Sequence, residues 1–276
     1  CISDTDLTPV DADPVYVVEG WIEQNNYPRV MVSRTYPYQT VAGLADLYDL
    51  LVSDAQVIVS SGNEREILSL VKDTMYTVLP IYRGYHLRGE IGKVYTLEVR
   101  IGNQIFTSTD TLLQPVNIDS AWFCPEPGLD HKGLIHASLT DPPEPGHCYR
   151  FLYKRLGMDD DYLGTMGTVL DDKLFNGTTI ECILLRSGLS IDQPLDSYFS
   201  DNQTVVIKTV RISPRYFKFL TSVITEVGIA LNPLNVQTHA ITLMDGGALG
   251  GWGCFAVSLD TLVIGQGEAL KSGNFH

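Results

Sequence analysis

The chain has 276 residues and is acidic, with 33 Asp and Glu against 19 Lys and Arg and a formal net charge of −14. This charge argues against a nucleic-acid partner, because phosphate binding requires a basic face, and against attraction to anionic lipids. Hydrophobic residues make up 44% of the chain, which is enough for a substantial core. No apolar run approaches the roughly 18 residues that a membrane-spanning helix needs.

The first residues are polar and acidic, and they follow a cysteine at position 1. A mature bacterial lipoprotein has this arrangement, because its signal peptide is removed at a cysteine that carries the acyl chains. Three acyl chains exceed the two signals required for stable anchoring. Residues 2–13 hold too few apolar side chains to fold. We therefore expect a lipid anchor at Cys1 and a tether over residues 1–13, the alternative being an arbitrary chain start.

Alternating apolar residues dominate the first hundred positions and predict short strands joined by turns. Gly62 and Gly102, each followed by Asn, indicate hairpins. A short helix is expected over residues 44–51, where Leu44, Leu47 and Leu51 recur at helical spacing. Residues 14–115 thus predict an N-terminal β-sandwich domain of the immunoglobulin-like or transthyretin-like kind. Strands are expected over 15–22, 29–34, 54–60, 66–71, 94–101 and 104–109.

Residues 116–276 predict a second, β-rich domain covered by one helix, so the fold class is all-β. The helix starts at the N-cap Ser213, continues through Pro214 and ends at Gly228. Its apolar residues share one face and predict packing on a sheet rather than on a partner; they are Phe217, Leu220, Val223, Ile224 and Val227. Strands are expected over 136–139, 148–153, 178–185 and 205–212, and then over 240–243, 254–257 and 261–264 around a glycine-rich stretch.

Seven segments in a fixed order carry a likeness to a known family. They are VVEGWI (17–22), DAQV (54–57), GKVYTLEV (92–99), VNID (116–119), DDKLFNG (171–177), PLNV (233–236) and GGALGGWGCF (246–255). In this order and spacing, the chain resembles the Bacteroidetes lipoprotein family known as domain of unknown function 4249, over about residues 15–264. One departure is that His239-Ala240-Ile241-Thr242 stands where family members usually show an Asn-Ile pair.

The resemblance implies a cell-envelope lipoprotein that is usually encoded near a TonB-dependent outer-membrane receptor. No catalytic residues are established for the family, so none are assigned here. We therefore expect a surface-exposed, lipid-anchored protein of the outer membrane, without enzymatic activity, that acts as an accessory or ligand-binding subunit in TonB-dependent nutrient uptake. Two alternatives stay open: a structural or adhesive surface protein, and a hydrolase acting on glycans or peptides.

The cysteines and the acidic clusters raise the questions of cross-links and of a metal. In an envelope protein, two disulfides could form among Cys124, Cys148, Cys182 and Cys254, the alternative being buried free thiols. No zinc site is expected, because no Cys-x-x-Cys or His-x-x-x-His spacing occurs. The acidic side chains either supply the oxygen ligands of a calcium site or are simply solvated in loops. They are Asp159, Asp160, Asp161, Asp171 and Asp172.

Aromatic residues in turn-rich segments are the remaining candidate contacts. Rigid rings with polar tips stack on sugars or anchor partner proteins, although they also cover sandwich edges. The candidates are Tyr36, Tyr38, Tyr82, Tyr85, Tyr198 and Trp252. The motifs Gly-x-Ser-x-Gly and His-Glu-x-x-His, a P-loop and a Rossmann fingerprint are all absent from the sequence. A glycosidase needs only two spaced carboxylates, so the hydrolase alternative is not removed by these absences.

Overall fold

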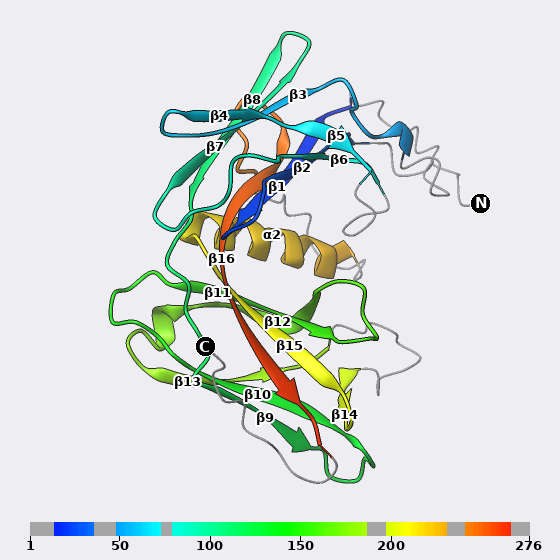
Figure 1. Cartoon of the computed structure of the whole chain (residues 1–276), viewed down its shortest axis with the longest axis vertical. Helices are drawn as coiled ribbons and strands as arrows, with labels where there is room; N and C mark the ends of the chain where they lie inside the picture. The colour runs from blue at the N-terminus through cyan, green and yellow to red at the C-terminus, as the bar shows by residue number, and fades with distance from the viewer. Residues whose placement is uncertain (1–13, 36–47, 73–78, 187–196, 231–240, 266–276) are drawn as a thin grey trace, which may run out of the picture.

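The computed structural model describes residues 14–35, 48–72, 79–186, 197–230 and 241–265. Over these ranges the protein is mostly β-strand with one long helix, which confirms the expected all-β class with a single covering helix. Figure 1 shows an upper and a lower group of strands, with the helix α2 (Pro214–Ala230) lying between them. No helix in these ranges is both long and apolar enough to cross a membrane.

The upper half contains the strands expected within residues 14–115. Gly62 and Gly102 each have a φ of 56° and form the turns of two hairpins, as predicted. The strand expected over 66–71 is two strands instead, because the chain changes sheets at the buried Leu68. The elements are β1 (Tyr16–Glu23), β2 (Arg29–Arg34), β3 (Gln56–Ser61), β4 (Glu64–Ile67), β5 (Ser69–Val71), β6 (Ile81–Arg83), β7 (Val94–Ile101) and β8 (Gln104–Thr111).

The helix expected over residues 44–51 falls partly outside the described residues. Tyr48 and Asp49 are helical, whereas Leu51 forms a bridge with Ser33 of β2. The predicted helix is therefore too long at its C-terminal end, because Leu51 pairs with β2.

The lower half has two sheets. Four of its strands correspond to the expected ones: β10, β11, β13 and β15. The elements are β9 (Ser120–Pro125), β10 (Lys132–Thr140), β11 (Cys148–Arg155), β12 (Leu163–Asp171), the 3-10 helix η1 (Asp172–Leu174), β13 (Thr179–Leu184), β14 (Phe199–Ser200) and β15 (Thr204–Ile212). One sheet has the order β13-β10-β14, with β9 also on β10, and the other contains β12, β11 and β15.

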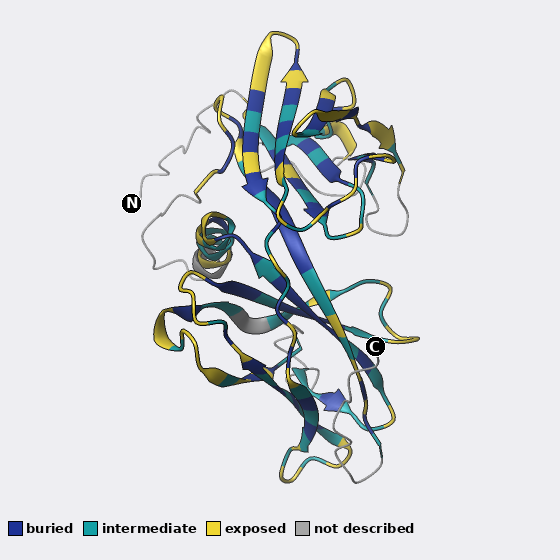
Figure 2. Ribbon diagram, turned by 60° about the vertical axis from the view of Figure 1, so that its left-hand side comes forward, coloured by how far each residue is buried: buried dark blue, intermediate teal, exposed yellow. Residues whose placement is uncertain are grey.

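A single long strand, β16 (Leu249–Val263), joins the two halves. Its first part pairs in parallel with β1, from Leu249 to Phe255, and its second part pairs antiparallel with β15, from Ala256 to Val263. The result is one eight-stranded sheet with the order β12-β11-β15-β16-β1-β2-β6-β5. Figure 2 shows the buried stretch of this strand running from one half into the other. The predicted domains 14–115 and 116–276 thus share a strand.

Strand alternation divides the long sheet into two faces. Trp252 and Cys254 of β16 lie in the upper core, and Leu262 lies in the lower core on the same face. Phe255 and Val257 point to the opposite face, where they pack in a third cluster under α2. Both large cores are therefore on one face of the sheet, and the helix is on the other.

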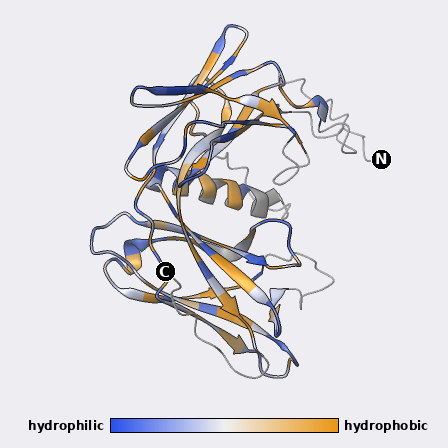
Figure 3. Cartoon of the chain, viewed as in Figure 1, coloured by the Kyte–Doolittle hydropathy of each residue, from blue (hydrophilic) through white to orange (hydrophobic). Residues whose placement is uncertain are grey.

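The helix α2 begins as predicted. The Tyr216 N–H donates to the Ser213 side chain at 3.1 Å, which identifies Ser213 as the N-cap. Polar and apolar colours alternate along its turns in Figure 3. Of the predicted packing face, Phe217 and Leu220 pack in the third cluster as expected, whereas Ile224 is 50% exposed. Tyr216 and Phe219, which were not predicted, also face the sheet.

The glycine-rich start of β16 makes room for these aromatic rings. A Cβ on Gly251 would lie 3.0 Å from the Phe219 ring, and a Cβ on Gly253 would lie 2.7 Å from the Tyr216 ring. The glycines are therefore the floor on which α2 packs.

Candidate functional site

The helix covers only part of its face of the long sheet, and a cleft of about 560 Å³ lies beside it. Strand alternation places the lining: Trp21 of β1, Arg150 of β11 and Phe255 of β16 all point away from the two cores. The walls come from the loop between β11 and β12, the loop after β1 and the first turns of α2. This sheet-face cleft thus forms at the junction of the two halves.

An ion pair crosses the floor of the sheet-face cleft. Lys208 Nζ lies 2.6 Å from Glu23 Oε1, and the same ammonium lies 4.8 Å from the centre of the Tyr162 ring. The side chain of Lys208 is only 9% exposed and that of Glu23 is 20% exposed. Lys208 comes from the lower half and Glu23 from the upper half, so the pair fixes the shape of the cleft.

The charge of the cleft differs from that of the chain. It has four basic residues, which are Arg29, Arg150, Lys154 and Lys208, and four acidic ones, which are Glu19, Glu23, Asp160 and Asp161. These charges balance, whereas the whole chain carries −14. Aromatic rings lie among them, including Trp21 and Tyr162. The cleft therefore offers apolar ring surfaces beside hydrogen-bonding groups of both signs, which is the usual chemistry of a small-molecule site.

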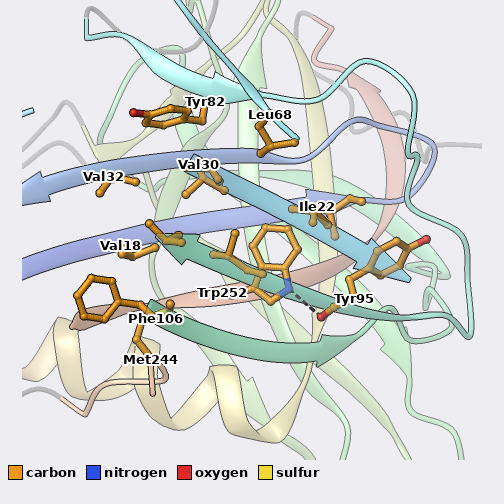
Figure 4. Close-up of a cluster of buried hydrophobic side chains, with 14 of the residues drawn as sticks. Val18, Ile22, Val30, Val32, Leu68, Tyr82, Tyr95, Phe106, Met244 and Trp252 are labelled. Atoms are coloured by element: carbon orange, nitrogen blue, oxygen red, sulfur yellow. Dashed lines mark hydrogen bonds between the residues drawn. The ribbon is translucent and has the colours of Figure 1, made fainter. Parts of the chain in front are cut away.

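Two of the predicted aromatic contacts belong to the upper core. Trp252 is fully buried and its indole N–H donates to the Tyr95 carbonyl at 3.1 Å (Figure 4). Tyr82 is 3% exposed, and its hydroxyl donates to the Val52 carbonyl and accepts from the Ala55 N–H. The prediction that these side chains contact a ligand is wrong, because packing and internal hydrogen bonds satisfy both.

Of the other predicted aromatic residues, Tyr85 and Tyr198 do not line the cleft. Tyr85 is 46% exposed, and its ring lies 6.4 Å from that of Tyr27. Tyr198 is half-buried in the lower half, where its carbonyl accepts a hydrogen bond from Arg186. Tyr36 and Tyr38 lie outside the described residues, as does Cys1. Among the described ones, Tyr85 and Tyr198 therefore stay predicted surface contacts.

The acidic residues do not form the predicted calcium site as one cluster. Asp159 and Asp161 lie in the loop between β11 and β12, whereas Asp171 lies at the far end of β12. The ends of β12, Leu163 and Asp171, pair with Tyr153 and Cys148 of β11, which are five residues apart along that strand. This spacing corresponds to about 17 Å. The prediction of a shared site is therefore wrong for geometric reasons.

Each acidic residue has a separate local role. Arg155 holds Asp159 with hydrogen bonds and, although burial opposes this effect, keeps the pKa of that carboxyl below its usual value. Asp160 and Asp161 line the sheet-face cleft, and Asp171 pairs with Lys173 at 2.5 Å. Asp172 is buried beside Asp141 and His147.

The four described cysteines are free thiols. Cys254 lies in the upper core, Cys182 in the lower core and Cys148 under α2, so these three are in separate clusters. Of the two alternatives, free thiols are therefore confirmed for these three and Cys124, and disulfides among them are ruled out. Burial raises the pKa of the Cys148 and Cys182 thiols to about 11, so both stay protonated at neutral pH.

The residues of the cleft floor were missed by sequence reasoning. Glu19, Trp21 and Glu23 alternate with core residues of β1, and this alternation is visible in the sequence. It identifies the outer face of a strand but gives no sign that Lys208, 185 residues away from Glu23, meets it there.

The sequence matches no model of a known protein family, and a search of curated proteins returns no match.

Proposed function

We propose that this protein is a non-enzymatic, ligand-binding subunit of the cell envelope, and that the sheet-face cleft holds its ligand. The observation that carries the proposal is the cleft itself, which is hollowed between the two halves and lined by rings and charges. Its volume of about 560 Å³ is typical of sites for small molecules. A largely buried ion pair across its floor supports a preformed site.

The lining favours a compact polar ligand without net charge. Trp21 and Tyr162 supply ring faces, and the balanced charged groups supply donors and acceptors. A short glycan combines apolar ring faces with hydroxyl groups and is the ligand class that we propose. A strongly anionic or cationic ligand would leave half of these charged groups without a favourable partner.

The cellular setting of the proposal rests on the family resemblance. It consists of a lipid anchor at Cys1, exposure at the surface of the outer membrane and service to a TonB-dependent receptor. Mass spectrometry of the protein from its native membrane tests the anchor, which is contradicted by an unmodified Cys1. A pull-down from native membranes tests the partner: recovery of a TonB-dependent receptor supports the accessory role, and its absence favours the adhesive alternative.

A glycan array followed by calorimetric titration tests the ligand. Trp21→Ala removes a ring of the cleft. Trp122→Ala is the matched control, because Trp122 is a half-buried tryptophan on β9 whose ring contacts that of His136 at 5.6 Å. We expect Trp21→Ala to weaken glycan binding by about tenfold or more. The ring contact is worth ~1.5 kcal/mol, and losing that free energy raises the Kd by about this factor. Trp122→Ala should bind like the parent chain.

Two results contradict this proposal. If Trp21→Ala binds the glycan as tightly as the parent chain, the ligand does not occupy the cleft. If the bound glycan is released as smaller products, the hydrolase alternative replaces the binding role.

A further inference from the structure

Three buried side chains from different connections meet at one end of the lower half. Asp141 follows β10, His147 precedes β11, and Asp172 begins η1 after β12. Their exposed fractions are 2%, 4% and 3%. One potential ligand atom from each residue lies within 4.8 Å of those of the others. This group is separate from the sheet-face cleft, whose lining does not include it.

Hydrogen bonds within the protein orient the two carboxylates. Asp172 Oδ2 accepts from the backbone N–H groups of Gly146 and His147, at 2.6 and 2.8 Å. Asp141 Oδ2 accepts from the Gly177 N–H at 3.0 Å, and Asp141 Oδ1 accepts from the Tyr149 hydroxyl. Both acids are thus fixed, and such outer partners are typical of carboxylates that bind metals.

The imidazole of His147 supplies an independent observation. Its Nδ1 lies 3.3 Å from Asp141 Oδ1 and 3.9 Å from Asp172 Oδ2, so it is aimed at both carboxylates. The side chain is 6% exposed, and Nδ1 makes no hydrogen bond within the described part of the chain. Leaving a buried polar atom without a partner is costly, by about 1–3 kcal/mol. A ligand that this nitrogen can bind removes that cost.

We propose that Asp141, His147 and Asp172 bind one divalent transition-metal ion, with Zn²⁺ as the best fit. One imidazole nitrogen and two carboxylate oxygens suit Zn²⁺, whereas Ca²⁺ and Mg²⁺ prefer oxygen ligands alone. Ligands of a tetrahedral zinc site lie about 3.4 Å apart, as bond lengths near 2.1 Å require. The separations of 3.3 and 3.9 Å from Nδ1 are close to this value. The three positions are separate in sequence, which explains why no zinc spacing is visible there.

The ion has a structural role. Asp141 extends from the sheet of β10, whereas His147 and Asp172 border β11 and β12 of the opposing sheet. A shared ion therefore clamps the two sheets of the lower half together at this end. The three ligands are nearly fully buried, which fits a structural role, and a water completes the tetrahedral coordination that three protein ligands leave open.

The test is zinc binding by the whole chain after chelation and dialysis. His147→Phe keeps an aromatic ring and removes the ligand nitrogen, together with its 3.3 Å contact to Asp141. His136→Phe is the matched control, since His136 also pairs with a carboxylate of the lower half, Glu181 at 2.5 Å. Calorimetry with ZnCl₂ should give one equivalent for the parent and for His136→Phe. Zn²⁺ should bind at least about 100-fold more weakly to His147→Phe.

Thermal melts provide a second measurement. Zinc in excess should raise the melting temperature of the parent by about 5 °C or more, and the same concentration of CaCl₂ should not. The proposal is overturned if the parent binds no zinc, if His147→Phe binds it equally, or if calcium alone stabilises.

Cobalt substitution keeps the test decisive if His147→Phe does not fold. Co²⁺ bound to the parent by nitrogen and oxygen should give d–d absorption without a sulfur-to-cobalt charge-transfer band. A strong charge-transfer band would place the ion on the free cysteines and refute the site.

Discussion

Lys208 of β15 and Glu23 of β1 form an ion pair of 2.6 Å that bridges the two halves of the protein across β16. Their strands are both neighbours of β16, one antiparallel and one parallel to it. The pair therefore forms only when β15 and β1 are both paired with β16. It lies on the face that carries the sheet-face cleft, so the same contact stabilises the junction and shapes the candidate site.

Substitutions of the ion pair should be strongly coupled. Glu23→Gln or Lys208→Met alone leaves a largely buried charge without its partner, and each should lower the free energy of unfolding by about 1–3 kcal/mol. The double variant removes both charges and should recover much of this loss. Urea unfolding of the four proteins gives the coupling free energy. Additive losses would show that the pair contributes nothing across the junction.

The packing of α2 on glycine leads to a second prediction. A Cβ on Gly253 would lie 2.5 Å from the Phe255 ring and 2.7 Å from the Tyr216 ring, so Gly253→Ala should destabilise the protein by about 1–3 kcal/mol. Gly164→Ala is the control, because a Cβ there meets nothing within 4 Å. Its effect should stay within about 0.5 kcal/mol in chemical denaturation. Equal effects of the two variants would contradict tight packing of the helix.

Local patterns in the sequence were sufficient for most of the elements. Period-2 alternation predicted β1, β2 and β7, and the Ser213-Pro214 pair predicted the start of α2. These predictions are confirmed because the backbone conformation that the local sequence favours is the one that the folded protein adopts at those positions.

Long-range pairing could not be predicted in this way. The parallel register of Val17 with Leu249 joins opposite ends of the chain, and no local pattern encodes such a pairing. Trp252 was misjudged for the same reason, because its glycine-rich surroundings resemble a loop until β1 and α2 are placed against them. No local pattern marks Asp141 and His147 as ligands, since only the folded connections bring them to Asp172.

A third prediction concerns pH and the buried Asp110 of β8, whose Oδ2 accepts from the Cys254 N–H at 2.8 Å. Burial raises the pKa of Asp110 above its usual value, although the hydrogen bonds and Arg215 oppose this effect. A raised pKa in the folded state means that stability is present at low pH and is lost as pH rises from about 4 through the folded pKa.

Asp110→Asn should therefore lack this pH dependence. The difference in unfolding free energy, parent minus variant, should fall as pH rises from 4 and should then become constant. Urea titrations at successive pH values measure this difference. A difference that increases with pH would show that the carboxylate is stabilised by its partners instead.

The cysteines give a fourth prediction. At pH 8 an aromatic disulfide reagent should modify Cys124, which is half-buried, faster than the buried thiols of Cys148 and Cys182. Burial raises the pKa of both latter thiols to about 11, which leaves little reactive thiolate. A Cys1→Ser background removes the reaction of the first residue, and Cys124→Ser should remove the fast phase. When the Cys1→Ser protein is denatured without reductant, four thiols should react with the reagent. A smaller number would indicate a disulfide.

The last prediction concerns Glu66, a buried carboxylate of β4 that organises the loop carrying Tyr85. Its oxygens accept from three consecutive backbone N–H groups, those of Tyr85, His86 and Leu87, at 2.5, 3.0 and 2.8 Å. Glu66→Gln replaces one acceptor oxygen with an NH₂ group that faces these donors. We expect a loss of about 2–3 kcal/mol in unfolding free energy, the range for hydrogen bonds to a buried charge.

Hydrogen exchange distinguishes a local from a global effect of Glu66→Gln. The amides of residues 85–87 should exchange faster in the variant, because their acceptor is weakened, while the β15–β16 ladder should keep its order of protection. Glu64→Gln on the same strand is the control: Glu64 is exposed and its pair with Lys93 is 3.8 Å long, so its loss should change stability by less than about 0.5 kcal/mol. If the two variants behave alike, Glu66 does not hold the loop, and the exposed position of Tyr85 must depend on Tyr27 and Arg83 instead.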